Sequence, residues 1–316
     1  MFFGEPIDIA IARIVGALVL VAAVAAWSWL PIRRNHASPL PGMALALLLP
    51  FTIPSAWLWP RIVATVLGIT LAGKQWALAR SGPLDPRMTQ TLPRFLFWLL
   101  MPPESRAAIE PGAQKAVRSR GLRRIARGVV KLAPIGALMW LHVALPRLHD
   151  NPWTESLWAL WLCWLAMSSL TDVASGLGML LTGLDVAETF DAPPLARSPR
   201  DFWARRWNLY VAHWLARHAF AQVGGRRHPL RATAIVFLGS GLFHEAFMFG
   251  CLGRFGPHTG FMLAFFALHG VSVMLEMAVT RRRKRLVPRP LAIALHFAWL
   301  LATAPLFFAP LGDLFG

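Results

Sequence analysis

The sequence predicts an all-α, polytopic integral membrane protein. Of its 316 residues, 56% are hydrophobic and 15% are charged, and the mean hydropathy is +0.50, too apolar for a water-soluble domain of this length. Runs of roughly 20 apolar residues, the length that crosses a bilayer as a helix, recur between basic or proline-rich segments. We therefore expect about eight transmembrane helices, with amphipathic helices at the membrane surface.

The first expected span covers residues 9–30. Its N-terminal flank carries Glu5 and Asp8 but no Lys or Arg. A signal peptide needs a positive flank, so we expect a retained helix although residues 23–25 resemble a cleavage site. The other expected spans are residues 40–59, 61–79, 128–148, 153–182, 230–252, 260–279 and 291–310.

Positive charge predicts the orientation of these spans. The 32 Lys and Arg residues gather in four clusters, at residues 33–34, 80–131, 197–231 and 281–289. Alternation along eight spans places every cluster on one side, which is cytoplasmic by the positive-inside rule. Both ends of the chain are then expected on the opposite side.

The formal net charge of +17 follows largely from these basic loops. Anionic membrane lipids are the first expected partner and the phosphates of a nucleotide-bearing substrate the second, so nucleic acid is not an expected partner. The densest basic stretch faces one or the other of these partners. It comprises Arg106, Lys115, Arg118, Arg120, Arg123, Arg124 and Arg127.

We expect one membrane domain over residues 1–316, with long cytoplasmic segments at 80–127 and 185–230. The first segment contains an apolar stretch, residues 95–101, too short to span and expected at the interface. The two cysteines, Cys163 and Cys251, predict neither a disulfide framework nor a metal site. Arg outnumbers Lys by 28 to 4 and Ala is abundant, which is typical of a GC-rich bacterial genome and favours a bacterial cytoplasmic membrane.

The segment 185–230 departs from generic membrane packing. Ser198, followed by Pro199, predicts the start of a helix with Ser198 as its N-cap. Aromatic side chains then recur at three- and four-residue intervals beside a basic face. We expect one amphipathic helix at the membrane surface, carrying Phe202, Trp203, Trp207, Tyr210, Val211 and Trp214.

Ionisable groups inside a bilayer cost roughly 2.5–3.5 kcal/mol at mid-helix, so each one is a candidate for function. His244, in the helix expected at 230–252, has the side chain best suited to proton transfer near neutral pH. Ser240 lies one turn earlier and can hold the imidazole ring, while the small residues 239–241 permit close helix approach or a substrate passage. Taken alone, a histidine in a membrane helix is more often an interhelical hydrogen-bonding residue than a catalytic one.

The other intramembrane candidates have structural explanations. His269 and His296 are expected to pack or to form interhelical hydrogen bonds, and Glu276 is expected to extend towards Arg281. Asp172 lies in a polar stripe with nearby serines, which fits either a polar lumen or interhelical hydrogen bonds. Glu245 points about 100° away from His244 around the helix, so a structural role is expected for it.

Two motifs together indicate a family. Residues 201–208, DFWARRWN, resemble the wax synthase signature DFWGRRWN, and residues 240–245, SGLFHE, resemble the SAxxHE element of diacylglycerol and sterol acyltransferases. Asn208 and His244 are separated by 36 residues, close to the spacing in those enzymes. The chain thus resembles the membrane-bound O-acyltransferases, specifically the wax synthase branch. Ala204 and Gly241 depart from the motifs, and these departures concern the branch more than the family.

The resemblance implies that an acyl group moves from acyl-CoA to the hydroxyl of a long-chain alcohol inside a membrane tunnel. His244 would be the general base, and Asn208 would hydrogen-bond the thioester carbonyl or the histidine. Helix capping is the structural alternative for Asn208. Acyl-CoA would be a co-substrate, with no metal or prosthetic group. The substrate-binding residues are expected to be Trp203, Arg205, Arg206, Trp207 and Ser240.

Alternatives remain open at this stage. The acceptor can be a sterol, diacylglycerol, a glycan or a peptide, and the donor can be an acyl carrier protein. A transporter or membrane scaffold is the alternative of a different class, in which Asp172, His244, His269 and His296 would form a proton path. The sequence has no inverted repeat to support it, and the oligomeric state stays open.

Overall fold

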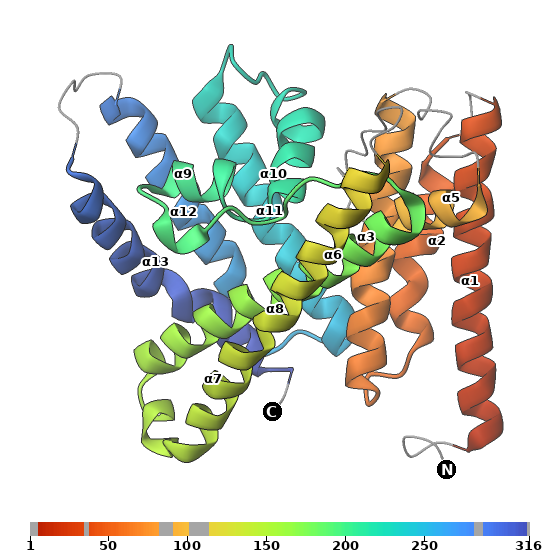
Figure 1. Ribbon diagram of the computed structural model, residues 1–316, viewed down its shortest axis with the longest axis horizontal. Coiled ribbons are helices and arrows are strands. Elements are labelled where there is room, and N and C mark those ends of the chain that lie inside the picture. The colour runs from red at the N-terminus through yellow and green to blue at the C-terminus, as the bar shows by residue number, and fades with distance from the viewer. Residues whose placement is uncertain (1–5, 35–37, 82–90, 101–113, 281–286, 315–316) are drawn as a thin grey trace. The chain divides into compact units, whose positions relative to one another are not determined.

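The computed structural model describes residues 6–34, 38–81, 91–100, 114–280 and 287–314. Across these ranges the regular structure is helical, with no β-strand (Figure 1). Six of the described helices are long and apolar enough to cross a bilayer. The protein is therefore an all-α, multi-pass membrane protein, as its composition predicts.

The six long helices coincide with expected spans to within a few residues. Each follows a continuous apolar run, so its position depends on local sequence. Asn151 caps the third of them by accepting a hydrogen bond from the Trp153 amide, and the left-handed Gly183 ends it. The six are α1 (Ile7–Arg34), α3 (Leu58–Ser81), α8 (Pro152–Thr182), α11 (Pro229–Leu252), α12 (Phe261–Thr280) and α13 (Arg289–Gly312).

Two expected spans are interrupted. The span expected at 40–59 forms α2 (Leu40–Leu48) and a short 3₁₀ turn, η1 (Leu49–Thr52), because Pro50 and Pro54 lack the N–H that continues a helix. The span expected at 128–148 divides at Lys131 between α6 (Gln114–Val130) and α7 (Leu132–Ala144). At about 1.5 Å per residue, α7 reaches roughly 20 Å, shorter than the hydrocarbon core of a bilayer.

Contacts divide the chain into two compact units. The first comprises Met1–Pro103, Leu242–Thr259 and Pro310–Gly316, and the second comprises Glu104–Gly241 and Gly260–Ala309. The single membrane domain expected over residues 1–316 stays a prediction. Each unit is described separately below.

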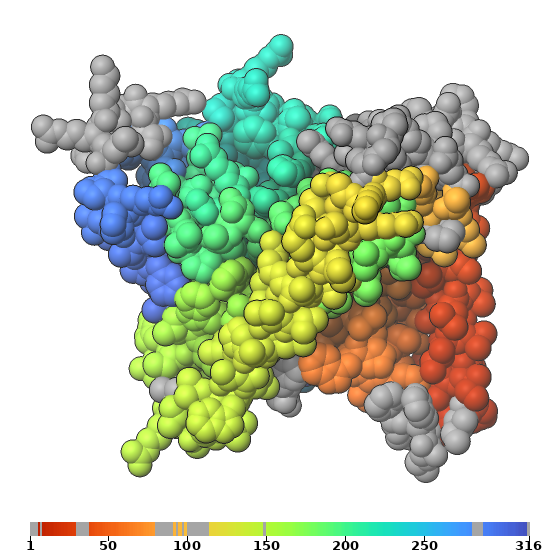
Figure 2. Space-filling view, in the orientation of Figure 1, coloured from red at the N-terminus to blue at the C-terminus, as the bar shows by residue number. Residues whose placement is uncertain are grey.

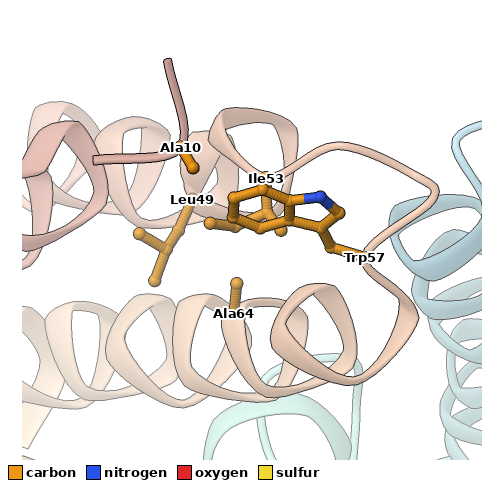
Figure 3. Packing of buried hydrophobic residues seen from close by; sticks show 5 residues of the cluster. All are labelled: Ala10, Leu49, Ile53, Trp57 and Ala64. Carbon is orange, nitrogen blue, oxygen red and sulfur yellow. The ribbon is translucent and has the colours of Figure 1, made fainter. Parts of the chain in front are cut away.

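The first unit is built around α1, α2 and α3, which pack against one another (Figure 1). Their core encloses the indole of Trp57, which is 2% exposed. Figure 3 shows this ring beside Leu49 and Ile53, with the small side chains of Ala10 and Ala64 nearby. The apolar stretch expected at the interface forms α5 (Leu92–Leu100), and the Lys74 ammonium lies 4.4 Å from the centre of the Trp98 ring.

In the second unit, α6 runs along α8 through small residues (Figure 1). A Cβ atom added to Gly176 would lie 2.6 Å from the Gly121 carbonyl oxygen, so the two backbones touch where neither residue has a side chain. The Ser169 hydroxyl donates to the Gly128 carbonyl across the same interface at 2.7 Å. The same pair of helices contacts the segment that follows α8 through Arg120, which pairs with Asp185.

Helices α11 and α12 also approach closely in the second unit. A Cβ atom at Gly241 would lie 2.9 Å from the Leu263 Cα, and one at Gly270 would lie 2.8 Å from the Phe237 Cβ. The close approach expected from residues 239–241 is therefore confirmed at Gly241. Gly239 has nothing within 4 Å of its Cβ position.

Candidate active site

The DFWARRWN motif begins as expected and then departs from expectation. Ser198 is the N-cap of α9 (Pro199–Arg205), and its Oγ accepts a hydrogen bond from the Asp201 amide at 3.1 Å. The prediction of one amphipathic helix is wrong, because the chain turns at Asn208. A second short helix, α10 (Leu209–Leu215), and one π-helical turn, η4 (Ala216–Phe220), follow.

Asn208 has the left-handed backbone conformation, with φ +43° and ψ +63°. Asparagine is one of the few side chains that tolerate this region. Its Oδ1 accepts a hydrogen bond from the Val211 amide at 3.5 Å and so caps α10. The Leu209 amide donates to the Thr189 carbonyl at 2.8 Å. The capping alternative is thus observed, and contact between Asn208 and substrate stays a prediction.

An ion pair between Asp201 and Arg206 stabilises the segment just before the turn at Asn208. Arg206 Nε donates to Asp201 Oδ2 at 2.9 Å, and the Arg197 amide donates to the same oxygen at 3.1 Å. Burial alone would raise the pKa of Asp201, but these hydrogen bonds hold it below its usual value. Arg206 Nη1 also donates to the Asp191 carbonyl at 3.1 Å. Arg206, an expected substrate-binding residue, therefore orders the loop.

Trp203 joins α9 to two membrane helices through His269. Trp203 Nε1 donates to His269 Nδ1 at 3.0 Å, and His269 Nε2 lies 2.9 Å from the Thr303 hydroxyl. Because Nδ1 accepts, the ring proton lies on Nε2, which assigns His269 as a neutral imidazole. His269 is completely buried, so the interhelical role expected for it is confirmed.

Glu276 of α12 holds the N-terminus of α9. Its two carboxylate oxygens accept from the Ser198 hydroxyl at 2.8 Å and from the Arg200 amide at 3.0 Å. A carboxylate is stabilised there by the unpaired amides and the dipole of the helix. Glu276 was expected to extend towards Arg281, which lies outside the described residues, and it binds α9.

The aromatic residues of the motif form one wall of a pocket. Phe202 is 3% exposed and stacks on Trp207, with ring centres 5.3 Å apart and planes 16° apart. The pocket is small, with a cavity volume of about 20 Å³, and is lined by Trp161, Trp164, Phe202, Trp207, Phe297 and Leu300, among others. Trp207 therefore belongs to an apolar pocket wall, whereas the Arg205 side chain is exposed.

An ion-pair network resolves the two readings of Asp172. Asp172 is 5% exposed on α8 and accepts from Lys131 Nζ at 2.6 Å and from Arg127 Nε at 2.8 Å. Arg127 also pairs with Glu188 at 2.5 Å, and Arg120 with Asp185 at 2.7 Å. The polar stripe of α8 thus faces α6 rather than an open lumen.

The same network divides the basic stretch into two faces. Arg120, Arg124 and Arg127 point towards acidic partners on α8 and on the segment that follows it. Lys115 and Arg118 are exposed on α6, the helix that is yellow in Figure 2. Arg106 lies outside the described residues.

His244 belongs to the part of α11 assigned to the first unit and is half-buried. Its ring lies 5.3 Å from that of Phe243. Ser240 donates its hydroxyl to the Val236 carbonyl at 2.9 Å. The functional pairing of His244 with Asn208, and the support of its ring by Ser240, stay predictions.

Arg61 is a buried charge that the sequence candidates omitted. It is 6% exposed on α3, and its guanidinium donates to the Gly250 carbonyl at 2.7 Å and to the Ile53 carbonyl at 2.8 Å. Gly250 lies in the last turn of α11, where unpaired carbonyls and the helix dipole favour a cation. The sequence offered one signal for Arg61, namely its position at the start of the span expected at residues 61–79, because a charge within a span is costly.

Comparison with known proteins places these features in a family. Residues 149–305 match the membrane-bound O-acyltransferase (MBOAT) family model. A long-chain-alcohol O-fatty-acyltransferase of Simmondsia chinensis is 36% identical over 138 residues, which are 40% of this chain and 39% of that protein. The probable long-chain-alcohol O-fatty-acyltransferase 1 of Arabidopsis thaliana is 28% identical over 211 residues, 63% of this chain and 59% of that protein.

A sterol enzyme is also among the relatives. The acyl-CoA–sterol O-acyltransferase 1 of Arabidopsis thaliana is 30% identical over 139 residues, 41% of this chain and 40% of that protein. The chain spans about two fifths to three fifths of the length of these three relatives.

Proposed function

Because residues 149–305 form a membrane-bound O-acyltransferase domain and the chain thereby belongs to that family, we propose that it transfers a long-chain acyl group from acyl-CoA to a lipid hydroxyl. The preferred acceptor in this proposal is a long-chain alcohol. The observation that carries it is the family match, which includes the motif segment and α11. The names of two relatives, a long-chain-alcohol O-fatty-acyltransferase and a probable one, support the choice of acceptor.

In the proposed reaction, His244 accepts the proton of the acceptor hydroxyl as the oxygen attacks the thioester carbonyl carbon. The carbon–sulfur bond then breaks, the ester is released, and the CoA thiolate takes the proton from the histidine. No acyl-enzyme forms, and no metal or prosthetic group is needed. Asn208 Nδ2, the donor not used in capping α10, stabilises the developing negative charge on the carbonyl oxygen.

The motif residues have two kinds of role in this proposal. Trp207 contacts the apolar part of a substrate, and the exposed Arg205 attracts the phosphates of CoA. Trp203 and Arg206 act as positioning residues, because their polar groups are engaged by His269 and Asp201. Ser240 keeps the proposed role of orienting the His244 ring.

The deciding experiment is ester formation by the purified protein in nanodiscs, with labelled palmitoyl-CoA and hexadecanol. Wild type is expected to form the wax ester, and His244→Ala is expected to be at least about 100-fold slower, the usual contribution of a general base. His228→Ala, which removes an exposed imidazole, is the matched control and should retain activity. Equal rates for His244→Ala and wild type would exclude His244 as the base.

A sterol is the second candidate acceptor, because one relative is an acyl-CoA–sterol O-acyltransferase. A competition assay with equal hexadecanol and sterol identifies the preferred acceptor from the ratio of the two esters. Diacylglycerol and palmitoyl-acyl carrier protein are tested in the same format. Ester formation from none of these combinations would reject the proposed activity.

The transporter alternative has weaker support. Asp172 is engaged by Arg127 and Lys131, and His269 by Trp203 and Thr303. In the described part of the chain no hydrogen bond joins Asp172, His269 and His296 into a proton path. The bacterial cytoplasmic membrane remains a proposal from composition, since the relatives named above are plant proteins.

A further inference from the structure

Three cations on the exposed side of α6 have no acidic partner. Lys115, Arg118 and Arg123 are exposed, and no carboxylate in the described part of the chain pairs with any of them. Arg123 Nη1 donates to the Ser119 hydroxyl at 3.0 Å, a neutral group one turn earlier. At about 100° per residue, the three cations lie within about 140° of one another around the helix axis. They form one positively charged face.

The other arginines of α6 point to the side that packs on α8. Each pairs with a carboxylate of α8 or of the segment that follows it, and they are Arg120, Arg124 and Arg127. The helix therefore separates compensated charges on its inner side from uncompensated charges on its outer side. An uncompensated cluster of like charges favours an anionic partner.

Apolar side chains continue the exposed face towards the C-terminal end of α6. Leu122, Val129 and Val130 are 62%, 52% and 71% exposed. At about 100° per residue they lie on the same side of the helix as the three cations. In α7, which follows, Trp140 is 70% exposed and Val143 is 77% exposed. The exposed face thus changes along its length from basic to apolar.

This change matches the passage from lipid headgroups into hydrocarbon. At about 1.5 Å per residue, Lys115 and Arg123 are about 12 Å apart along the axis, and Val130 lies about 10 Å further on. The headgroup layer of one leaflet is about 5–8 Å thick, and long basic side chains extend several Å towards it. The cations can therefore reach the headgroups while the valine side chains contact acyl chains.

The composition of the face favours a phospholipid over a free nucleotide. Guanidinium and ammonium groups bind phosphate oxygens through charge-assisted hydrogen bonds, which either ligand would satisfy. A nucleotide has no acyl chains to cover the exposed apolar residues, whereas a phospholipid has two. The acyl-CoA of the proposed function must also reach the motif, and the segment that leads to it lies on the other side of α6, against Arg120 and Arg124.

We propose that this outer face of α6, the yellow helix of Figure 2, is a binding surface for an anionic phospholipid of the membrane. The lipid phosphate pairs with Lys115, Arg118 and Arg123. The acyl chains lie over the apolar residues between positions 122 and 130. The surface goes beyond the proposed function, because binding there requires no acyl transfer.

The test is lipid binding to the purified full-length protein, measured by native mass spectrometry in an uncharged detergent. Phosphatidylglycerol and phosphatidylcholine with identical acyl chains are titrated separately. Wild type is expected to bind phosphatidylglycerol at least about tenfold more tightly, and a higher ammonium acetate concentration should reduce the difference by screening. Equal affinity for the two lipids would overturn the proposal.

A triple variant tests the three cations together. Each cation near anionic headgroups contributes roughly fivefold in affinity. Lys115→Gln/Arg118→Gln/Arg123→Gln should therefore bind phosphatidylglycerol at least about tenfold more weakly, with unchanged affinity for phosphatidylcholine. Unchanged affinity for phosphatidylglycerol would contradict the assignment.

The matched control removes three exposed cations from elsewhere in the second unit. It is Arg226→Gln/Arg227→Gln/Arg231→Gln. Its affinity for phosphatidylglycerol should stay within about twofold of wild type. An equal loss in the two triple variants would show a general effect of net charge and would reject a specific surface on α6.

Photolabelling of wild type tests the location without any variant. Phosphatidylglycerol with a diazirine in its acyl chain is compared with the matching phosphatidylcholine probe, each in nanodiscs of phosphatidylcholine. Peptide mapping should find at least about threefold more label from the anionic probe within residues 122–130. Equal labelling by the two probes would refute the location.

CoA without an acyl chain distinguishes a lipid surface from a nucleotide site. It should not displace phosphatidylglycerol from wild type at a concentration equal to that of the lipid. Displacement would assign the three cations to a nucleotide and reject the proposal. None of these measurements uses acyl transfer, so this inference and the proposed function fail separately.

Discussion

Replacement of Asp172 by Leu is expected to destabilise the second unit strongly. The carboxylate is almost fully buried and compensates Lys131, whose side chain is 19% exposed. Without it, Lys131 keeps the Ser168 hydroxyl at 2.6 Å, a neutral partner. Removing one member of a buried ion pair typically costs 3–5 kcal/mol.

The expected loss lies at the lower end of that range, about 3 kcal/mol. Arg127, the second cation, is nearly half exposed and keeps Glu188, so it loses less than Lys131. For a chain of this size the loss corresponds to roughly 5–10 °C in the midpoint of thermal unfolding, measured in detergent by tryptophan fluorescence. Asp150→Asn, at an exposed site, is the control.

The double variant Asp172→Leu/Lys131→Met separates the ion pair from a general packing effect. Two apolar residues of suitable size often restore the stability lost when one buried charge is left alone. We expect the double variant to recover most of the midpoint. A wild-type midpoint for Asp172→Leu, or no recovery in the double variant, would refute the reasoning.

Three further predictions concern the turn and the buried cation. Asn208→Gly should have an unfolding midpoint close to that of wild type, whereas Asn208→Ala should lose about 1–2 kcal/mol of stability, because Ala is strained at positive φ and cannot cap α10. Equal midpoints for the two variants would contradict this prediction. Loss of ester formation in both variants would show that the Asn208 amide itself is required. Arg61→Met should lower the unfolding midpoint because the Gly250 and Ile53 carbonyls lose their donor, with partial recovery in Arg61→Lys, and a wild-type midpoint would argue against capping of α11. The folded-state pKa of Asp201 is depressed, so the contribution of this carboxylate to stability is present above the unfolded-state pKa of about 4 and is lost as pH falls through the folded-state pKa. The unfolding midpoints of wild type and Asp201→Asn should therefore differ at pH 6 and converge near pH 3. A difference that stays constant with pH would contradict this role of Asp201.

Local sequence was sufficient to predict the features that depend on neighbouring residues, such as helix positions and helix caps. Six spans follow from continuous apolar runs, and Ser198 with Pro199 marked the start of α9 correctly. The DFWARRWN and SGLFHE motifs led to the family that the comparison then identified. The same approach joined residues 40–59 into one span, because hydropathy averaged over a window passes over Pro50 and Pro54.

Long-range contacts explain the features that the sequence did not predict. The aromatic spacing continues through Asn208 as if the helix were unbroken, yet the turn depends on the Thr189 carbonyl and on the bond between Arg206 and Asp201. The two partners of Asp172, Lys131 and Arg127, lie 41 and 45 residues earlier in the chain, in a stretch whose basic residues looked alike. The sequence by itself therefore determined that the chain lies in a membrane, where its long helices run and which family it resembles, because these depend on composition and on contiguous stretches of apolar or motif residues. The tertiary structure alone decided which charges pair, which aromatic groups face the pocket and where the motif helix breaks, since each depends on groups that are distant in sequence and meet only when the helices pack.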